Sequence, residues 1–329
     1  MKYYFAPLEG ITGYVYRSVH HKYFPGTDRY YMPFVAPNYT KHFKTREKQD
    51  VAPENNEGLA AVPQVLSNKA DEALWAVEEL AGLGYEEVNL NLGCPMPTVA
   101  RKKKGSGLLK YTDELDAYLD GVFSGMEARP SDRPPVRISV KTRLGTDSTE
   151  EAEELVRIYN RYPISELIVH PRCQKDLYRG TPDLEAFLLV WQKSTNPVVY
   201  NGDITVPADV ERIAEMCAAA GHGLPAARKL ESVMIGRGFL ADPSLVRQCR
   251  GGNKINAEEL NAFHDELYSR FQETLPGTKV VLSHMKELWF YMGNLFVDGD
   301  KYMKDIRRAN NRFQYEAAVR VLLSMGRMK

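Results

Sequence analysis

Residues 87–95, EVNLNLGCP, show the unit from which the fold is built. An apolar run that is typical of a buried strand ends in a glycine, a cysteine and a proline, which mark a turn. The amphipathic stretch Ala70–Leu83 precedes this run, and Asp113–Met126 follows it. A strand between two amphipathic helices is the repeating unit of a parallel α/β sheet.

The same unit recurs along the chain. Eight β-rich runs are predicted as strands: Tyr3–Pro7, Tyr30–Phe34, Ala61–Leu66, Glu87–Leu92, Val136–Thr142, Glu166–His170, Pro197–Asn201 and Ser232–Gly236. Further helical stretches between them include Glu150–Tyr162 and Ala208–Ala220. Eight βα units in about 250 residues are typical of a (β/α)8 TIM barrel. A doubly wound open α/β sheet is the alternative.

The pattern changes at Gly251 and Gly252, which read as a domain boundary. Beyond them the sequence predicts three helices: Ala257–Glu273, Thr278–Gly293 and Asp300–Met325. We therefore expect residues 1–250 to form the barrel domain and residues 251–329 to form a small C-terminal all-helical domain.

The composition excludes several classes of protein. The 329 residues include 43 Lys+Arg and 43 Asp+Glu, so the formal net charge is zero, which argues against a wholly basic nucleic-acid binder. A hydrophobic content of 43% excludes a disordered chain. No apolar run approaches the ~18 residues of a membrane span, and the N-terminus lacks the features of a signal peptide. The four cysteines form no CxxC pair, so no metal site is expected. We expect a monomeric cytoplasmic protein.

Charge is uneven within the last 30 residues, where eight Lys or Arg face three Asp or Glu. Four cations fall on one face of the predicted helix 300–325: Lys301, Lys304, Arg308 and Arg312. A neighbouring face is apolar: Met303, Ile306, Phe313 and Ala317. The cationic face is either a solvated helix surface or a surface that contacts phosphates.

Polar groups follow nearly every predicted strand. A barrel brings the carboxyl ends of its strands to one mouth, where active sites lie. The residues at those ends are Pro7, Leu8, Glu9, Gln64, Asn91, Cys94, Lys141, Arg143, His170, Arg172, Asn201, Gly202, Asp203, Gly236 and Arg237.

Specific chemistry is predicted at three places: the two glycines after strands seven and eight, Lys141 and Cys94. The loops after strands seven and eight often bind phosphate, and Gly202 and Gly236 would let it approach the backbone, unless they are ordinary turn glycines. Lys141 would meet an anion in the barrel mouth or extend to water. Cys94 lies in a turn, where a protonated thiol could act as an acid.

These residues fall in motifs that resemble the tRNA-dihydrouridine synthase family. The motifs, in order, are APLEG (6–10), NLNLGCP (89–95), GSGLL (105–109), VKTRLG (140–145), VHPR (169–172), NGDI (201–204) and IGRG (235–238). The resemblance covers the barrel from Phe5 to about Arg250.

The resemblance implies an enzyme with bound FMN that reduces uridines of tRNA to 5,6-dihydrouridine, with NADPH as electron donor. The residues it implies for FMN binding are Pro7, Leu8, Glu9, Gln64, Lys141, His170, Asn201, Gly202, Asp203, Gly236 and Arg237. Cys94 matches the catalytic cysteine, which would protonate C5 of the uracil. Contacts to the RNA substrate are expected from Asn91, Arg143, Arg172, Lys103, Lys286 and Arg308.

The resemblance is weaker in the helical domain. Many members have an Arg-Lys-His run before a Trp-Tyr pair, whereas residues 283–291 here read SHMKELWFY. His284 and Lys286 keep part of the basic character.

Four rival functions remain. An FMN barrel acting on a small molecule, such as a dihydroorotate dehydrogenase or an ene reductase, would share Lys141 and the phosphate site. An aldolase would use Lys141 as a Schiff base. A non-catalytic RNA-binding protein would not need the strand-end residues. The same chemistry on ribosomal RNA is the fourth, and the sequence does not identify the target uridine.

Overall fold

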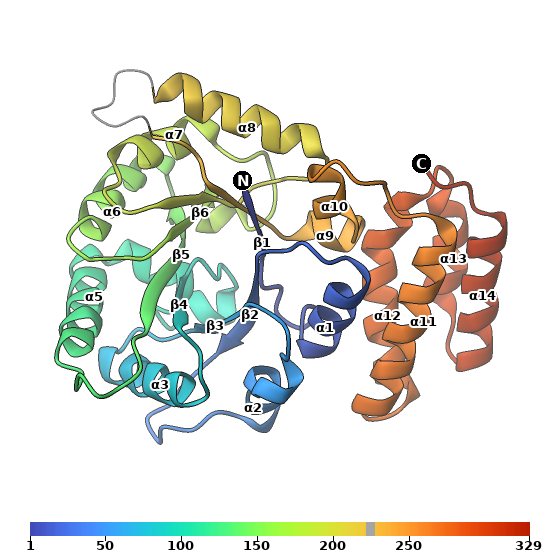
Figure 1. The fold of residues 1–329 in the computed structure, drawn as a ribbon, viewed down its shortest axis with the longest axis horizontal. Helices are drawn as coiled ribbons and strands as arrows, with labels where there is room; N and C mark the ends of the chain where they lie inside the picture. The colour runs from blue at the N-terminus through green and yellow to red at the C-terminus, as the bar shows by residue number, and fades with distance from the viewer. Residues whose placement is uncertain (222–227) are drawn as a thin grey trace.

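The computed structural model describes residues 1–221 and 228–329, and its core is a closed barrel of eight parallel strands (Figure 1). The strands follow one another around the barrel in chain order: β1 (Lys2–Phe5), β2 (Arg29–Val35), β3 (Ala61–Val65), β4 (Glu87–Leu92), β5 (Arg137–Gly145), β6 (Leu167–Cys173), β7 (Val198–Tyr200) and β8 (Ser232–Ile235). The barrel closes where β1 pairs with β8, from Lys2 opposite Ser232 to Phe5 opposite Ile235. All eight predicted strands are confirmed, and the doubly wound sheet is excluded.

Helices cover the outside of the barrel. They are α1 (Tyr14–Tyr23), α2 (Thr45–Val51), α3 (Ala70–Gly82), α4 (Pro97–Ala100), α5 (Thr112–Glu127), α6 (Ala152–Tyr159), α7 (Leu184–Lys193), α8 (Pro207–Ala220), α9 (Arg237–Ala241) and α10 (Leu245–Cys249). The longer ones bury one apolar face against the strands. In α3, for example, Ala73, Ala76, Val77 and Leu80 are buried at the spacing of a single helix face.

Five short 3-10 helices complete the connections: η1 (Pro53–Asn55), η2 (Gly105–Lys110), η3 (Thr149–Glu151), η4 (Gln174–Asp176) and η5 (Gly293–Leu295). Of these, η2 packs against β4 and β5 at the strand ends that carry the predicted site.

The barrel interior is strongly polar along β4. Glu87, Asn89 and Asn91 alternate along this strand and therefore share one face. At the amino end of the barrel, Glu87 and Glu166 flank Arg29, whose Nη1 lies 3.0 and 2.7 Å from their carboxylates. This partly buried charge cluster lies at the amino end of the barrel, opposite the carboxyl end at which the site is expected.

Four C-terminal helices form a separate layer beside the barrel (Figure 1). They are α11 (Ala257–Thr274), α12 (Thr278–Met292), α13 (Gly299–Arg308) and α14 (Arg312–Met325). α11 packs against α1, and α12 packs against α9. The predicted boundary at residue 250 falls between α10 and α11.

The predicted single helix 300–325 is wrong, because the chain breaks it after Arg308. Asn311 caps the second helix, since its side chain accepts a hydrogen bond from the backbone N–H of Gln314 at 3.0 Å. The side chain of Lys286 donates to the carbonyl of Ala309, which ends the first helix. The hydrogen bonds at these two helix ends therefore interrupt the single helix that the apolar periodicity predicts.

The break changes both predicted faces. Lys301, Lys304 and Arg308 stay together on α13, but Arg312 begins the next helix and pairs with Glu316 at 2.6 Å. Met303 and Ile306 are buried as predicted. Phe313 and Ala317 are exposed instead of packing, because the buried face of α14 consists of Tyr315, Val319 and Leu322.

In residues 1–221 and 228–329, no helix combines the length and the hydropathy that crossing a membrane requires.

Candidate active site

A cavity of about 460 Å³ opens at the carboxyl ends of the strands. All eleven residues predicted to bind FMN line it: Pro7, Leu8, Glu9, Gln64, Lys141, His170, Asn201, Gly202, Asp203, Gly236 and Arg237. Asn91, Cys94 and Arg143 line it as well. The barrel thus gathers into one cavity side chains that are spread over 230 residues of sequence.

The loop that carries Cys94 is held by hydrogen bonds on both sides. The Asn91 side-chain oxygen accepts from the backbone N–H groups of Gly93 and Cys94, at 3.1 and 2.6 Å. The hydroxyl of Ser106 donates to the Cys94 carbonyl at 3.0 Å. Gly105 lies so close that a Cβ there would be 2.6 Å from that carbonyl, and its φ is +57°. The GSGLL motif therefore serves to fix the cysteine loop.

The surroundings of Cys94 keep its thiol protonated at neutral pH. Burial raises the pKa of the thiol, and this effect outweighs the hydrogen bond from the Met96 backbone and the charges of Arg143 and Lys141, which lower it. A protonated thiol in a cavity is equipped to give up a proton rather than to attack as a thiolate.

A chain of amide hydrogen bonds links the cysteine loop to the interior of the barrel. Asn91 donates to Gln64 at 2.7 Å, and Gln64 donates to Asn89 at 2.7 Å. Asn89 donates to Ser139 at 2.9 Å, and Ser139 donates to Glu87 at 2.8 Å. These bonds fix the side-chain amides, so Asn91 and Gln64 each keep one N–H for a ligand.

Lys141 is a partly buried lysine, and the charges acting on it from the described residues include no carboxylate. Burial, together with the positive charge of Arg143, lowers its pKa to about 7, and Cys94 opposes this shift only weakly. Such a lysine gains stability when an anion binds beside it. The predicted role of Lys141 beside an anionic ligand fits this environment.

Two arginines and a carboxylate form a cluster at the carboxyl ends of β6, β7 and β8. Asp203 accepts from Arg172 at 2.6 Å and from Arg237 at 2.6 Å. Arg172 also donates to the ring of His170 at 3.0 Å, and burial and the surrounding cations lower the pKa of His170 well below its usual value. His170 is therefore neutral, and Arg237 keeps its other donors for the cavity.

Glycines shape the cavity wall at the same strand ends. A Cβ on Gly236 would stand between the side chains of Ala6 and Leu8, both of which line the cavity, and would fill part of it. A Cβ on Gly202 would lie 2.1 Å from the Tyr200 hydroxyl. Gly236 therefore leaves backbone open toward the cavity, whereas the packing of Tyr200 alone requires a glycine at 202.

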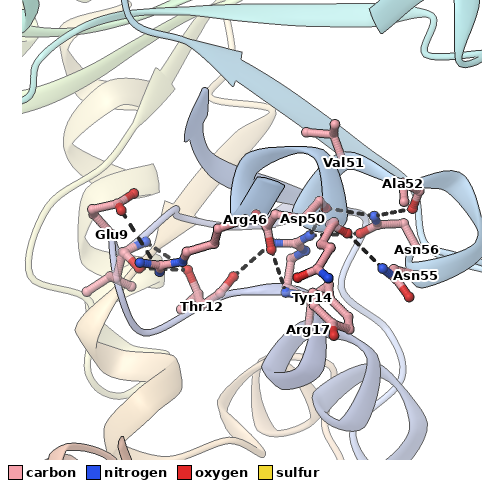
Figure 2. Close-up of polar contacts among 12 residues, drawn as sticks. Glu9, Thr12, Tyr14, Arg17, Arg46, Asp50, Val51, Ala52, Asn55 and Asn56 are labelled. Atoms are coloured by element: carbon pink, nitrogen blue, oxygen red, sulfur yellow. Dashed lines mark hydrogen bonds and ion pairs between the residues drawn. The ribbon is translucent and has the colours of Figure 1, made fainter. Parts of the chain in front are cut away.

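The first cavity loop is fixed from behind by a buried ion pair (Figure 2). Arg17 has no exposed side-chain surface, pairs with Asp50 of α2 at 3.1 Å and donates to the Thr12 carbonyl at 2.8 Å. The Thr12 hydroxyl accepts from the backbone N–H of Leu8 at 2.8 Å. Arg17 thereby connects α2 to the loop that carries Glu9.

Arg46 of α2 extends toward Glu9, which lines the cavity (Figure 2). Its guanidinium lies 4.0 Å from the Glu9 carboxylate, and its charge contributes to the lowered pKa of His284, after burial. Arg46 therefore lies near both the barrel rim and α12.

The lining residues that were not predicted include Tyr178, Phe290, Tyr291 and Asn294. Tyr178 follows β6, and the guanidinium groups of Arg143 and Arg237 lie 5.5 and 5.4 Å from its ring centre. The other three come from the helical layer. In the sequence, the aromatic run at 289–291 is the feature that marks this region. Phe290 and Tyr291 reach the cavity because α12 packs against α9.

The remaining predicted substrate residues lie away from the cavity surface. Arg172 is 1% exposed and donates to His170, Asp203 and the carbonyls of Arg179 and Gly180, so it supports the wall from behind. Lys103 pairs with Glu114, and Lys286 caps α13. Arg308 is exposed on α13. RNA contacts by these residues stay predictions.

Comparisons with known proteins agree with the motifs. The family model described as dihydrouridine synthase (Dus) matches residues 4–326. The chain is 26% identical over 242 residues to tRNA-dihydrouridine synthase B of Pasteurella multocida, a match that covers 74% of this chain and 67% of that protein. It is 29% identical over 261 residues to tRNA-dihydrouridine(16) synthase of Pseudomonas syringae, covering 76% and 74%. It is 26% identical over 243 residues to tRNA-dihydrouridine synthase B of Escherichia coli K12, covering 74% and 69%. Because the family model spans nearly the whole chain, this protein belongs to the dihydrouridine synthase family.

Proposed function

We propose that this protein reduces specific uridines of tRNA to 5,6-dihydrouridine, with FMN as bound cofactor and NADPH as electron donor. The protein belongs to the dihydrouridine synthase family, and the relatives it matches are tRNA-dihydrouridine synthases. One observation supports the proposal further: a partly buried cysteine with a raised pKa shares a cavity with a lysine suited to an anion and with a glycine-lined wall. Reduction of a pyrimidine needs both a proton source and a site for the reductant.

The residues of the cavity fit FMN. Lys141, Gln64 and His170 would hold the isoalloxazine ring, and a cation at Lys141 would stabilise the reduced, anionic ring. The ribityl phosphate would lie against Asn201, Gly202, Asp203, Gly236 and Arg237. Pro7, Leu8 and Glu9 would cover the ring from the first loop. When bound and reduced, FMN would supply the hydride that C6 of the uracil accepts.

Cys94 would supply the proton that C5 of the uracil accepts. Its raised pKa keeps that proton on the sulfur until the base has accepted negative charge. The free N–H of Asn91 and the guanidinium of Arg143 are donors in the same cavity, suited to the uracil carbonyl oxygens. These donors would orient the base between the thiol and the opposite wall.

The target uridine must leave its stack in order to enter the cavity, because the reacting carbons are inaccessible within stacked RNA. The helical layer closes one side of the mouth with Tyr291 and Asn294. Lysines and arginines at 101–104 and on α13 would contact the RNA backbone. We propose on this basis that residues 251–329 serve as an RNA-binding domain.

The test is a nucleoside analysis. The purified FMN-loaded protein is incubated with NADPH and with tRNA that lacks dihydrouridine, and the product is mapped by mass spectrometry. Dihydrouridine at defined positions is the expected result and also identifies the uridine. If dihydrouridine forms in ribosomal RNA, or if a free pyrimidine is reduced, while tRNA gives no product, then tRNA is not the substrate.

A further inference from the structure

Phe290 is an exposed aromatic residue at the mouth of the cavity. Its side chain is 64% exposed, whereas its helix neighbours Trp289 and Met292 are fully buried. A single exposed aromatic side chain is ordinary on a protein surface, and Phe290 differs from most of the others because it also lines the cavity that holds Cys94.

The position of Phe290 is fixed by the packing beneath it. The indole N–H of Trp289 donates to the Tyr315 hydroxyl at 3.0 Å, and that hydroxyl contacts the His264 ring at 2.8 Å. The Phe290 ring meets the Tyr291 ring edge to face, with centres 5.1 Å apart. Its free face is therefore presented from a rigid helix, which lowers the entropic cost of binding a planar partner.

Cations stand around the same mouth. Arg237 lines the cavity, and Arg46 is 69% exposed on the rim near α12. An aromatic surface beside cations is the combination with which proteins hold unstacked nucleotides, through base stacking and phosphate attraction. Tyr178 is less available for stacking, since the guanidinium groups of Arg143 and Arg237 already lie near its ring.

We propose that Phe290 stacks on the base of a nucleotide next to the target uridine in the RNA chain. The inference rests on the proposed function: when the target base enters the cavity, its neighbour loses a stacking partner and lies at the mouth. Phe290 replaces that partner. It is a positioning residue that holds the RNA so that the uridine stays in the cavity.

The test compares Phe290→Ala, Phe290→Leu and Phe290→Trp as FMN-loaded proteins. Stacking on one base predicts that Phe290→Ala weakens binding of unmodified tRNA transcript on the order of tenfold. Phe290→Leu keeps an apolar side chain without an aromatic face and should weaken binding nearly as much, whereas Phe290→Trp should restore it. The control is Leu83→Ala, because Leu83 is an exposed apolar residue (42%) that follows α3 in the barrel domain and is not among the cavity residues.

A second measurement separates stacking from a general effect on the fold. Transcripts carry an abasic nucleotide either directly 5′ or directly 3′ of the reduced uridine. The wild type should bind one of these two transcripts about tenfold more weakly than it binds the intact transcript. Phe290→Ala already lacks the stacking contact, so it should bind that abasic transcript and the intact transcript with equal affinity. Additive losses in both transcripts, or full affinity of Phe290→Ala, would overturn the inference.

The two proposals fail in different ways. If the wild type forms no dihydrouridine in tRNA, the proposed function fails and Phe290 loses its assigned partner. If the wild type forms dihydrouridine while the abasic transcripts show no coupling to Phe290, only the stacking role is overturned.

Discussion

A thiol can act as an acid only while it holds its proton, and burial keeps Cys94 in that form. We expect Cys94→Ala to retain the flavin absorbance but to form dihydrouridine ~10²- to 10⁴-fold more slowly, since it lacks the proton donor. The rate is measured by mass spectrometry of tRNA nucleosides under single-turnover conditions.

Two variants control this prediction. Cys94→Ser keeps the size of the side chain but is a much weaker acid, so it should also be slow. Cys249→Ser removes a thiol elsewhere in the chain, near Tyr3, and should react like the wild type. An unchanged rate for Cys94→Ala would show that another group protonates the base.

We expect Lys141 to make FMN binding depend on pH. Burial and Arg143 lower its pKa to about 7, so at pH 8 the amine of the unliganded protein is mostly neutral. A bound anion raises this pKa again, and binding of FMN at pH 8 should then take up about one proton. The uptake is measured by calorimetry in buffers of different ionisation enthalpy.

The sign of the effect on stability follows from the same shift. Unfolding returns the Lys141 pKa toward 10.5, so between pH 7 and 10 the unfolded chain binds more protons and the contribution to stability rises with pH. Lys141→Met should abolish both this dependence and the proton uptake. Equal proton uptake by Lys141→Met would assign the titration to a different group.

At the scale of elements, α2 and the first cavity loop depend on one buried ion pair (Figure 2). Arg17→Met keeps the length of the side chain but leaves Asp50 unpaired and removes the bond to the Thr12 carbonyl. We expect a loss of about 3–5 kcal/mol in the free energy of unfolding, measured in urea on the FMN-free protein. FMN affinity should fall as well, because Leu8 and Glu9 lose their support.

The matched control is Arg157→Met. Arg157 also pairs with a carboxylate, Glu154 at 2.6 Å, but both side chains are largely exposed. Exposed pairs contribute little, so this variant should unfold like the wild type. Similar losses for the two variants would show that burial of the Arg17 pair is not what anchors the loop.

The elements themselves were largely predictable, because apolar strands and one-sided helices are local patterns. Helix α3 and strand β4 were predicted within one residue of their ends. The break between α13 and α14 was missed. Asn311 with Gln314 three residues later is a helix-start pattern, but the prediction followed the apolar periodicity through it.

At the scale of the whole molecule, the site residues fall into two groups. Those at strand ends were predictable, since a barrel places all strand ends at one mouth whatever the loops do. Phe290, Tyr291 and Asn294 were not, because they join the cavity only through the packing of α12 on α9. Arg172 was correctly placed at a strand end, but the sequence did not show that its side chain would be buried. In the structure it pairs with Asp203 and donates to His170 instead of facing the cavity.

The surface charge also belongs to the whole molecule, because a chain of zero net charge needs a local cationic face to bind a polyanion. Lys301, Lys304 and Arg308 form such a face on α13. If all three contact phosphates, replacing them with glutamine should reduce the slope of log affinity for tRNA against log salt by about 2.

The control for this prediction removes the same charge from the other side of the molecule. Glutamine at Arg157, Arg161 and Lys193, near α6 and α7 on the barrel side opposite the helical layer, should leave the salt slope unchanged (Figure 1). Both triple variants have the same net charge, so a difference between them reports where the RNA backbone lies. Equal reductions would mean that overall charge, rather than the α13 face, sets the attraction. No reduction in the α13 variant would leave that face as solvated surface and move the backbone contacts to the barrel rim, where Arg46 is the first residue to replace.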